Sequence, residues 1–107
     1  MKSPQFSGKP RKRRLIVPFI LRQVKGDSMV PTLKAGQLVV GRQKRELSVG
    51  DVVIASHNGI EKIKRIEKQQ GDRIYLLGDN RSASTDSRNF GWLPLETVVA
   101  KVVWPKL

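Results

Sequence analysis

Two side chains in this sequence of 107 residues are candidates for nucleophilic chemistry, one serine and one lysine. Ser28 follows Gly26-Asp27 and precedes an apolar pair that ends in proline, which favours a sharp turn presenting a hydroxyl and free backbone N–H groups. An ordinary loop is the alternative. The single histidine, His57, is the conventional base for a serine nucleophile, but it borders an Asn-Gly turn, and we interpret it as a solvent-exposed turn residue.

A lysine can replace histidine as the base when its surroundings keep it neutral. Strand alternation over residues 60–66 places Lys64 between apolar side chains on one face, which consists of Ile60, Lys62, Lys64 and Ile66. If that face is turned inward, burial lowers the pKa of Lys64 from about 10.4. The pattern alone favours the alternative, in which Lys64 is one more surface lysine of a basic strand.

The segments that position these residues are expected to be short strands. Turn signals built from glycine, asparagine and aspartate separate apolar runs, and Asn58-Gly59 between two such runs is typical of a β-hairpin. Hydrophobic residues make up 38% of the sequence, which is enough for the core of one domain. We predict a mainly β, single small domain of five to seven short, mostly antiparallel strands. The predicted strands are 15–21, 37–41, 52–55, 60–66, 73–77 and 97–104.

The net charge of +12 is concentrated near the N-terminus. Residues 1–25 carry eight basic and no acidic side chains, whereas residues 26–107 carry 13 basic and 9 acidic ones. We therefore divide the chain into a basic leader, 1–14, and a folded domain, 15–107. The basic run 9–14 suits phosphate-rich surfaces, either nucleic acid or anionic lipid headgroups, and a solvated, disordered leader is the alternative. No apolar run approaches the roughly 20 residues of a membrane-spanning helix.

Polar side chains dominate a further segment, residues 78–91, which has no apolar periodicity. Its acidic and basic residues indicate internal ion pairs rather than a mobile loop. The calcium-loop pattern fails at Arg81 and Ala83, so we expect no metal ion there. The absence of cysteine excludes a disulfide framework, a thiolate zinc site and a cysteine nucleophile, and a single histidine excludes a multi-histidine centre. No cofactor is expected.

Four segments along the chain resemble the sequence boxes of the type I signal peptidase family. In the family's order they match its nucleophile box, its next strand box, its lysine box and its final box. The four segments are Gly26–Leu33, Gly50–Val53, Ile63–Ile66 and Gly78–Gly91. The final segment, with the run Gly-Asp-Asn-Arg-Ser-Ala-Ser-Thr-Asp-Ser-Arg, is the most specific match. The resemblance covers about residues 24–104.

This resemblance implies a peptidase with a serine–lysine dyad, on the largely β fold shared with self-cleaving proteins of the phage-repressor type. Ser28 would be the acyl-forming nucleophile, with its backbone N–H in the oxyanion hole, and Lys64 would be its general base. Ser84 would hydrogen-bond and orient the lysine. The residues that brace the site would be Asp79, Asp86, Arg88 and Arg65.

Three departures from the family pattern narrow the expected function. Position 26 is glycine where some signal peptidases have a serine that assists the oxyanion. The usual N-terminal membrane anchor is missing from the sequence, and the segment from Lys64 to Gly78 is too short for a cap domain. We therefore expect a compact, anchor-free member similar to the nickel superoxide dismutase maturation peptidases, located in the cytoplasm or peripherally at a membrane.

The expected function is that of a serine endopeptidase that removes an N-terminal signal or propeptide from a protein precursor. A self-cleaving regulator of the repressor type is one alternative, although the one Ala-Gly pair, Ala35-Gly36, lies after Ser28. A non-enzymatic nucleic-acid-binding module that uses the basic leader is the other. Its aromatic residues form no recognisable RNA-stacking motif. The sequence gives no indication of the oligomeric state.

Overall fold

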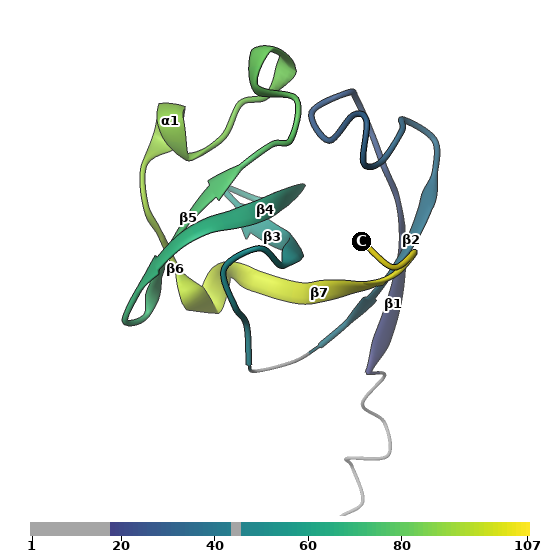
Figure 1. Ribbon diagram of the computed structural model, residues 1–107. Helices are drawn as coiled ribbons and strands as arrows, with labels where there is room; N and C mark the ends of the chain where they lie inside the picture. Colours follow the sequence, from purple (N-terminus) through teal and green to yellow (C-terminus); the bar gives the residue numbers. More distant parts are fainter. Residues whose placement is uncertain (1–17, 44–45) are drawn as a thin grey trace, which may run out of the picture.

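The computed structural model describes residues 18–43 and 46–107, which form one antiparallel sheet of seven strands (Figure 1). The strand order is β1-β2-β7-β3-β4-β5-β6, so the last strand in the chain lies between the second and the third. The predicted mainly β, single small domain is confirmed. The strands are β1 (Phe19–Gln23), β2 (Leu38–Arg42), β3 (Val52–His57), β4 (Ile60–Gln70), β5 (Arg73–Leu77), β6 (Leu93–Pro94) and β7 (Val98–Trp104).

The β3–β4 hairpin has the turn that the sequence predicts. Asn58 and Gly59 adopt φ angles of 54° and 78°, and His57 pairs directly with Ile60 across the turn. Both central residues of a two-residue hairpin turn of this kind need positive φ, which asparagine and glycine tolerate. Ile60, however, is 60% exposed, because it lies at the end of the hairpin beyond the core. The inward face of β4 therefore begins after this residue.

Two apolar clusters share the central strand β3. Its side chains alternate between them, since Val52 and Ile54 belong to one cluster and Val53 and Ala55 to the other. A strand buried on both faces reads as a continuous apolar run, as residues 52–55 do. The first cluster also contains Val24, Met29, Leu33, Val39, Ala100 and Val102, and the second contains Ile66, Ile74, Leu76 and Leu93.

Short helical turns complete the described structure. They are α1 (Ser87–Phe90) and the 3-10 turns η2 (Arg81–Ala83) and η3 (Leu95–Thr97). Within residues 18–43 and 46–107, no helix has the length and apolarity that crossing a membrane requires. The predicted leader, 1–14, lies outside the described residues, as do the first three residues of the strand predicted over 15–21.

Candidate active site

Ser28 and Lys64 meet where strand β5 stops pairing with strand β4. The distance between Lys64 Nζ and Ser28 Oγ is 2.8 Å. The last paired residue of β4 on that side is Arg65, opposite Leu77, so Lys64 is the first residue beyond the pairing. Its side chain is nevertheless only 6% exposed. The structure thus brings the two residues expected to form a dyad into direct contact.

The loop that carries Ser28 is closed at its base by backbone hydrogen bonds. The Val24 N–H donates to the carbonyl of Gln37, and the Gly36 N–H donates to the carbonyl of Val24. Met29, the neighbour of Ser28, is 1% exposed and belongs to the first apolar cluster. Because this methionine is anchored in the core, the adjacent serine is held at a fixed position above it.

The amine of Lys64 has a lowered pKa. Burial is the largest cause, because desolvation penalises the charged ammonium. The carboxylate of Asp86 opposes this effect, and the positive charge of Lys62 adds to it. A hydroxyl at hydrogen-bond distance from a lysine with a lowered pKa is better placed to give up its proton than one beside an ordinary surface lysine.

The segment 78–91 docks directly on the serine loop. The Asn80 N–H donates to the carbonyl of Ser28 at 2.8 Å, and its side-chain amide donates to the carbonyl of Asp27 at 3.0 Å. The approach is closest at Gly78, where a Cβ atom would lie 2.6 Å from the Ser28 carbonyl oxygen and 2.6 Å from Ser84 Cβ. Only glycine fits this position without displacing backbone.

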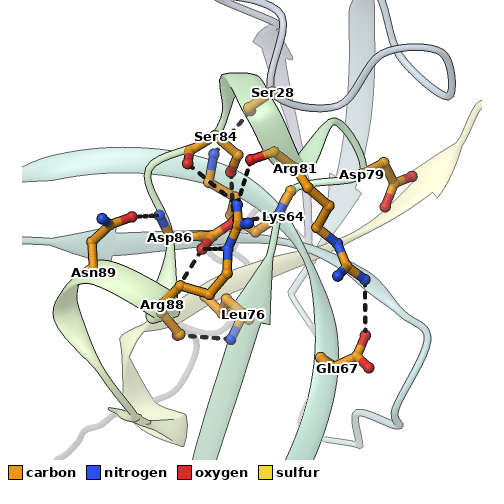
Figure 2. A network of polar contacts seen from close by, with 12 residues as sticks. Ser28, Lys64, Glu67, Leu76, Asp79, Arg81, Ser84, Asp86, Arg88 and Asn89 are labelled. Atoms are coloured by element: carbon orange, nitrogen blue, oxygen red, sulfur yellow. Dashed lines mark hydrogen bonds and ion pairs between the residues drawn. The ribbon is translucent and has the colours of Figure 1, made fainter.

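Asp86 is the centre of the polar network drawn in Figure 2. Its carboxylate is fully buried, and three neighbouring residues donate hydrogen bonds to it. These are Gly78 through its N–H at 2.9 Å, Ser84 through its hydroxyl at 2.7 Å, and Arg88 through Nε at 2.9 Å. Asp86 also caps helix α1 by a capping box with Asn89.

Burial by itself would raise the pKa of Asp86, but the hydrogen bonds outweigh it. The donors on Arg88, Gly78 and Ser84 together hold the pKa of this carboxyl far below its usual range. The lowered pKa favours the anionic form of Asp86 at neutral pH. Its negative charge acts on Lys64, whose pKa it raises against the effect of burial.

A second ion pair fastens the serine loop to the lysine strand. Arg65 binds Asp79 through two hydrogen bonds of 2.9 Å each, and a third guanidinium N–H donates to the carbonyl of Gly50. The hydroxyl of Thr32 donates to the same Asp79 carboxylate at 2.5 Å. The pKa of Asp79 is lowered, mainly by the hydrogen bond from Arg65. The Asp79 carboxylate thus joins the segment 78–91 to the serine loop and to strand β4.

A cleft of about 660 Å³ leads to Ser28 and Lys64. One wall is formed by residues 21–25, at the end of β1, and the other by residues 59–64, at the start of β4. Within the described part of the chain, the backbone N–H of Ser28 donates to no protein acceptor, so it is available to a ligand in the cleft. No group of three or more His, Asp or Glu side chains in that part is arranged to hold a metal ion.

Both walls of the cleft present unpaired strand edges. On β4, Ile66 exchanges backbone hydrogen bonds with Gly50 and Asp51 on the β3 side. The backbone groups of Glu61 and Ile63 therefore point to the opposite side, which is the cleft, because strand residues alternate in direction.

The same alternation applies to β1. The carbonyl of Pro18 accepts from the Gln43 N–H, and the Val24 N–H donates to Gln37, both on the β2 side. Leu21 thus directs its backbone groups toward the cleft. The cleft therefore has a strand edge on each side that an extended peptide can pair with.

The sequence of the described region matches a known family model. The model, described as Peptidase S24-like, matches residues 18–99. The chain belongs to the Peptidase S24-like family. This match confirms the resemblance to signal peptidases drawn from the four sequence boxes and establishes that the protein is of the peptidase type.

Two characterised relatives of this S24-like chain are subunits of membrane proteases. Mitochondrial inner membrane protease subunit 1 of Schizosaccharomyces pombe is 37% identical over 117 aligned positions, which cover 81% of this chain and 74% of the relative. Mitochondrial ATP-independent inner membrane protease subunit 1a of Arabidopsis thaliana is 30% identical over 115 positions, which cover 77% and 68%.

The S24-like region contains all seven site residues singled out from the sequence, but one contact of these residues and the exposure of His57 differ from expectation. Ser84 was expected to hydrogen-bond Lys64, whereas its hydroxyl donates to Asp86, so its link to the lysine runs through that carboxylate. His57 was expected to be solvent-exposed, whereas it is half-buried with its ring 4.5 Å from the ring of Phe90. The ring of Phe90, the last residue of α1, covers His57 at the end of the β3–β4 hairpin.

Sequence reasoning missed two polar residues that hold the site together. Thr32 and Asn80 both bridge segments about 50 positions apart, with separations of 47 to Asp79 and 53 to Asp27. Both residues lie inside the boxes that carried the family resemblance. Their position within those boxes was the available signal, since neither residue type is unusual in a loop.

Proposed function

We propose that this protein is a serine endopeptidase that removes an N-terminal signal or propeptide from protein precursors, with Ser28 as nucleophile and Lys64 as general base. The observation that carries the proposal is the 2.8 Å contact between the Ser28 hydroxyl and a lysine that is 6% exposed. A lysine on a protein surface is charged at neutral pH and cannot accept a proton. Burial supplies the neutral amine that the reaction needs.

In the proposed reaction, the neutral amine of Lys64 accepts the hydroxyl proton while Ser28 Oγ forms a bond to the scissile carbonyl carbon. The free N–H of Ser28 donates to the carbonyl oxygen as it gains negative charge. The Lys64 ammonium then gives its proton to the leaving amine as the C–N bond breaks, which leaves an acyl ester on Ser28. A water molecule, deprotonated by Lys64, hydrolyses the ester and restores both side chains.

The two open strand edges support a peptide substrate rather than a small molecule. An extended segment that enters the cleft can pair with the backbone of Leu21 on one side and of Glu61 and Ile63 on the other. Such pairing contacts the backbone of the substrate and requires a substrate segment that has no secondary structure of its own. N-terminal extensions of precursor proteins meet this requirement.

The function is tested by incubating the purified full chain with the proteome of its source cell and identifying new protein N-termini by mass spectrometry. We expect new termini at one position near the start of a few proteins, whose folded parts remain intact. Cleavage confined to the protein's own chain would instead support the self-cleaving alternative. The absence of any new terminus would contradict the peptidase proposal.

The rate of cleavage is expected to rise with pH. Only the neutral form of Lys64 accepts the serine proton, so below its lowered pKa the rate falls about tenfold per pH unit. Protonated Lys64 also costs stability, and this cost is relieved as the pH rises from the folded pKa toward the unfolded value of about 10.4. A rate that stays flat between about pH 6 and 10, with the chemical step limiting, would contradict lysine as the base.

We further propose that the protein works at the surface of an anionic membrane. One face of β1, β2 and β7 exposes apolar side chains, of which Leu21, Val40 and Trp104 lie opposite one another in the strand register, and we call it the outer apolar face. It consists of Phe19, Leu21, Leu38, Val40 and Trp104, of which Leu21 and Trp104 are each 58% exposed. An apolar face whose first strand follows the basic run 9–14 in the sequence fits lipid headgroups better than nucleic acid.

Replacement of Trp104 by serine is expected to weaken binding to vesicles that contain phosphatidylserine by about 10-fold, since the indole no longer enters the headgroup region. Sedimentation with vesicles measures the affinity. Val49→Ser is the matched control, because Val49 is equally exposed at 59% but lies outside the outer apolar face. Equal losses in the two variants, or binding to neutral vesicles alone, would contradict the proposal.

A further inference from the structure

Lys62 lies beside the lysine of the candidate active site. It precedes Lys64 by two positions on β4, so the two side chains leave the same face of the strand, with Cα atoms roughly 6.6 Å apart. Lys62 is half-buried and lines the same cleft as Ser28 and Lys64. Two lysines so close along one face repel each other when both are charged.

An aromatic ring holds the Lys62 ammonium near the cleft. Its Nζ lies 5.8 Å from the centroid of the Phe90 ring, a distance at which the ring face attracts a cation. Phe90 is itself fixed at the end of α1 by its contact with the ring of His57 at 4.5 Å. The charge is therefore anchored on one side of Lys64 instead of turning freely into solvent.

The other charges around Lys64, apart from that of Lys25, are paired with each other. Asp86 is bound by Arg88, and across the cleft Arg22 and Glu61 form a two-point ion pair with distances of 2.6 and 3.1 Å. Within residues 18–43 and 46–107, no carboxylate pairs with Lys62 at salt-bridge distance. The charged groups near Lys64 are Asp86 with Arg88 at the start of α1, and Lys62, Glu61, Arg22 and Lys25, which line the same cleft.

We propose that Lys62 is a positioning residue for the reaction and acts through Lys64. Its positive charge, unpaired and anchored over Phe90, disfavours a second positive charge beside it and so keeps Lys64 in the neutral form that accepts the Ser28 proton. The inference rests on the proposed serine–lysine mechanism. Burial lowers the pKa of Lys64, but the Asp86 anion raises it. The charge of Lys62, held over the Phe90 ring, adds to the effect of burial.

The test compares pH profiles of kcat/KM for the full chain and three variants. Lys62→Gln is expected to shift the rising limb to higher pH by about 0.5 to 1 unit, which lowers activity on that limb about 3- to 10-fold and leaves the alkaline plateau unchanged. Lys62→Arg keeps the charge and the wild-type profile. The matched control is Lys68→Gln, because Lys68 also lies over a ring, 5.2 Å from that of Tyr75, but on the far half of β4.

A second readout separates this inference from the proposed function. The Lys64 amine is titrated directly by NMR on lysine-labelled protein, with its signal assigned by its loss in Lys64→Met. An upward shift in Lys62→Gln alone supports the inference even if no substrate is cleaved. Unchanged titration in that variant, an equal shift in Lys68→Gln, or loss of the wild-type profile in Lys62→Arg would overturn it.

Discussion

Replacing Ser28 by alanine or Lys64 by methionine is expected to lower kcat by about 10⁴-fold or more, because each change removes one of the two groups that act as a unit. The two variants should differ in stability. Ser28→Ala removes only a hydroxyl, whereas Lys64→Met replaces a buried amine, 6% exposed, by an apolar chain of similar length. The free energy of unfolding at pH 7 should therefore be unchanged in the first variant and raised in the second.

A loss of activity combined with a gain of stability in Lys64→Met distinguishes a catalytic lysine from a structural one. A structural lysine would lose stability on replacement and affect the rate only through unfolding. Urea denaturation and single-turnover cleavage of a precursor measure the two quantities side by side. Ser82→Ala and Lys68→Met serve as controls, since both residues are exposed, Ser82 lies in the segment 78–91 that docks on the serine loop, and Lys68 lies on the same strand as Lys64. Turnover retained by either test variant would refute the dyad.

Asp86→Ala is expected to lower the free energy of unfolding by about 3 kcal/mol, the cost typical of removing one partner from a buried ion pair. The change leaves the Gly78 N–H and the Ser84 hydroxyl without their acceptor and removes the cap of α1. Because the folded pKa of Asp86 is lowered, its contribution is present above the unfolded pKa of about 3.9 and is lost as pH falls below it.

Urea titrations of wild type and variant at neutral and acidic pH check both statements. The difference in stability should shrink as the pH falls below about 4, because the Asp86 carboxylate of the unfolded chain then takes up a proton that the folded protein resists. Asp72→Ala, at an exposed turn position, is the control and should change stability by less than about 0.5 kcal/mol. A difference that persists unchanged into acid would show that Asp86 contributes through packing rather than charge.

Features of the fold that depend only on residues adjacent in the sequence could be predicted from it. The Asn58-Gly59 turn and the strand at 73–77 follow from local turn chemistry, and both are present as predicted. The extension of β4 to Gln70 was missed, because its last residues are polar and become a strand only by pairing with β5. Helix α1 was missed because four residues are too few to show a helical period.

In the candidate site, too, the features set by local sequence could be predicted and those set by tertiary contacts could not. The alternation of β4 placed Lys64 on an apolar face, and Ile66 does lie in the core, but the exposure of Ile60 depends on where the hairpin leaves the core. The three-way junction at Asp79 is a set of tertiary contacts, and no pattern within one segment encodes it, since its partners Arg65 and Thr32 are 14 and 47 positions away. The bond from Ser84 to Asp86 spans only two positions, but the sequence does not show that the hydroxyl binds this carboxylate rather than Lys64.

The position of β7 between β2 and β3 has a consequence for the order of events during synthesis. The serine loop leaves β1 and returns to β2, whereas the lysine belongs to β4, and β7 is the strand that joins these two halves of the sheet. Strand β7 pairs with both β2 and β3, which do not pair with each other. We therefore expect the continuous sheet that holds the nucleophile and the base together to close only after residues 98–104 have been synthesised.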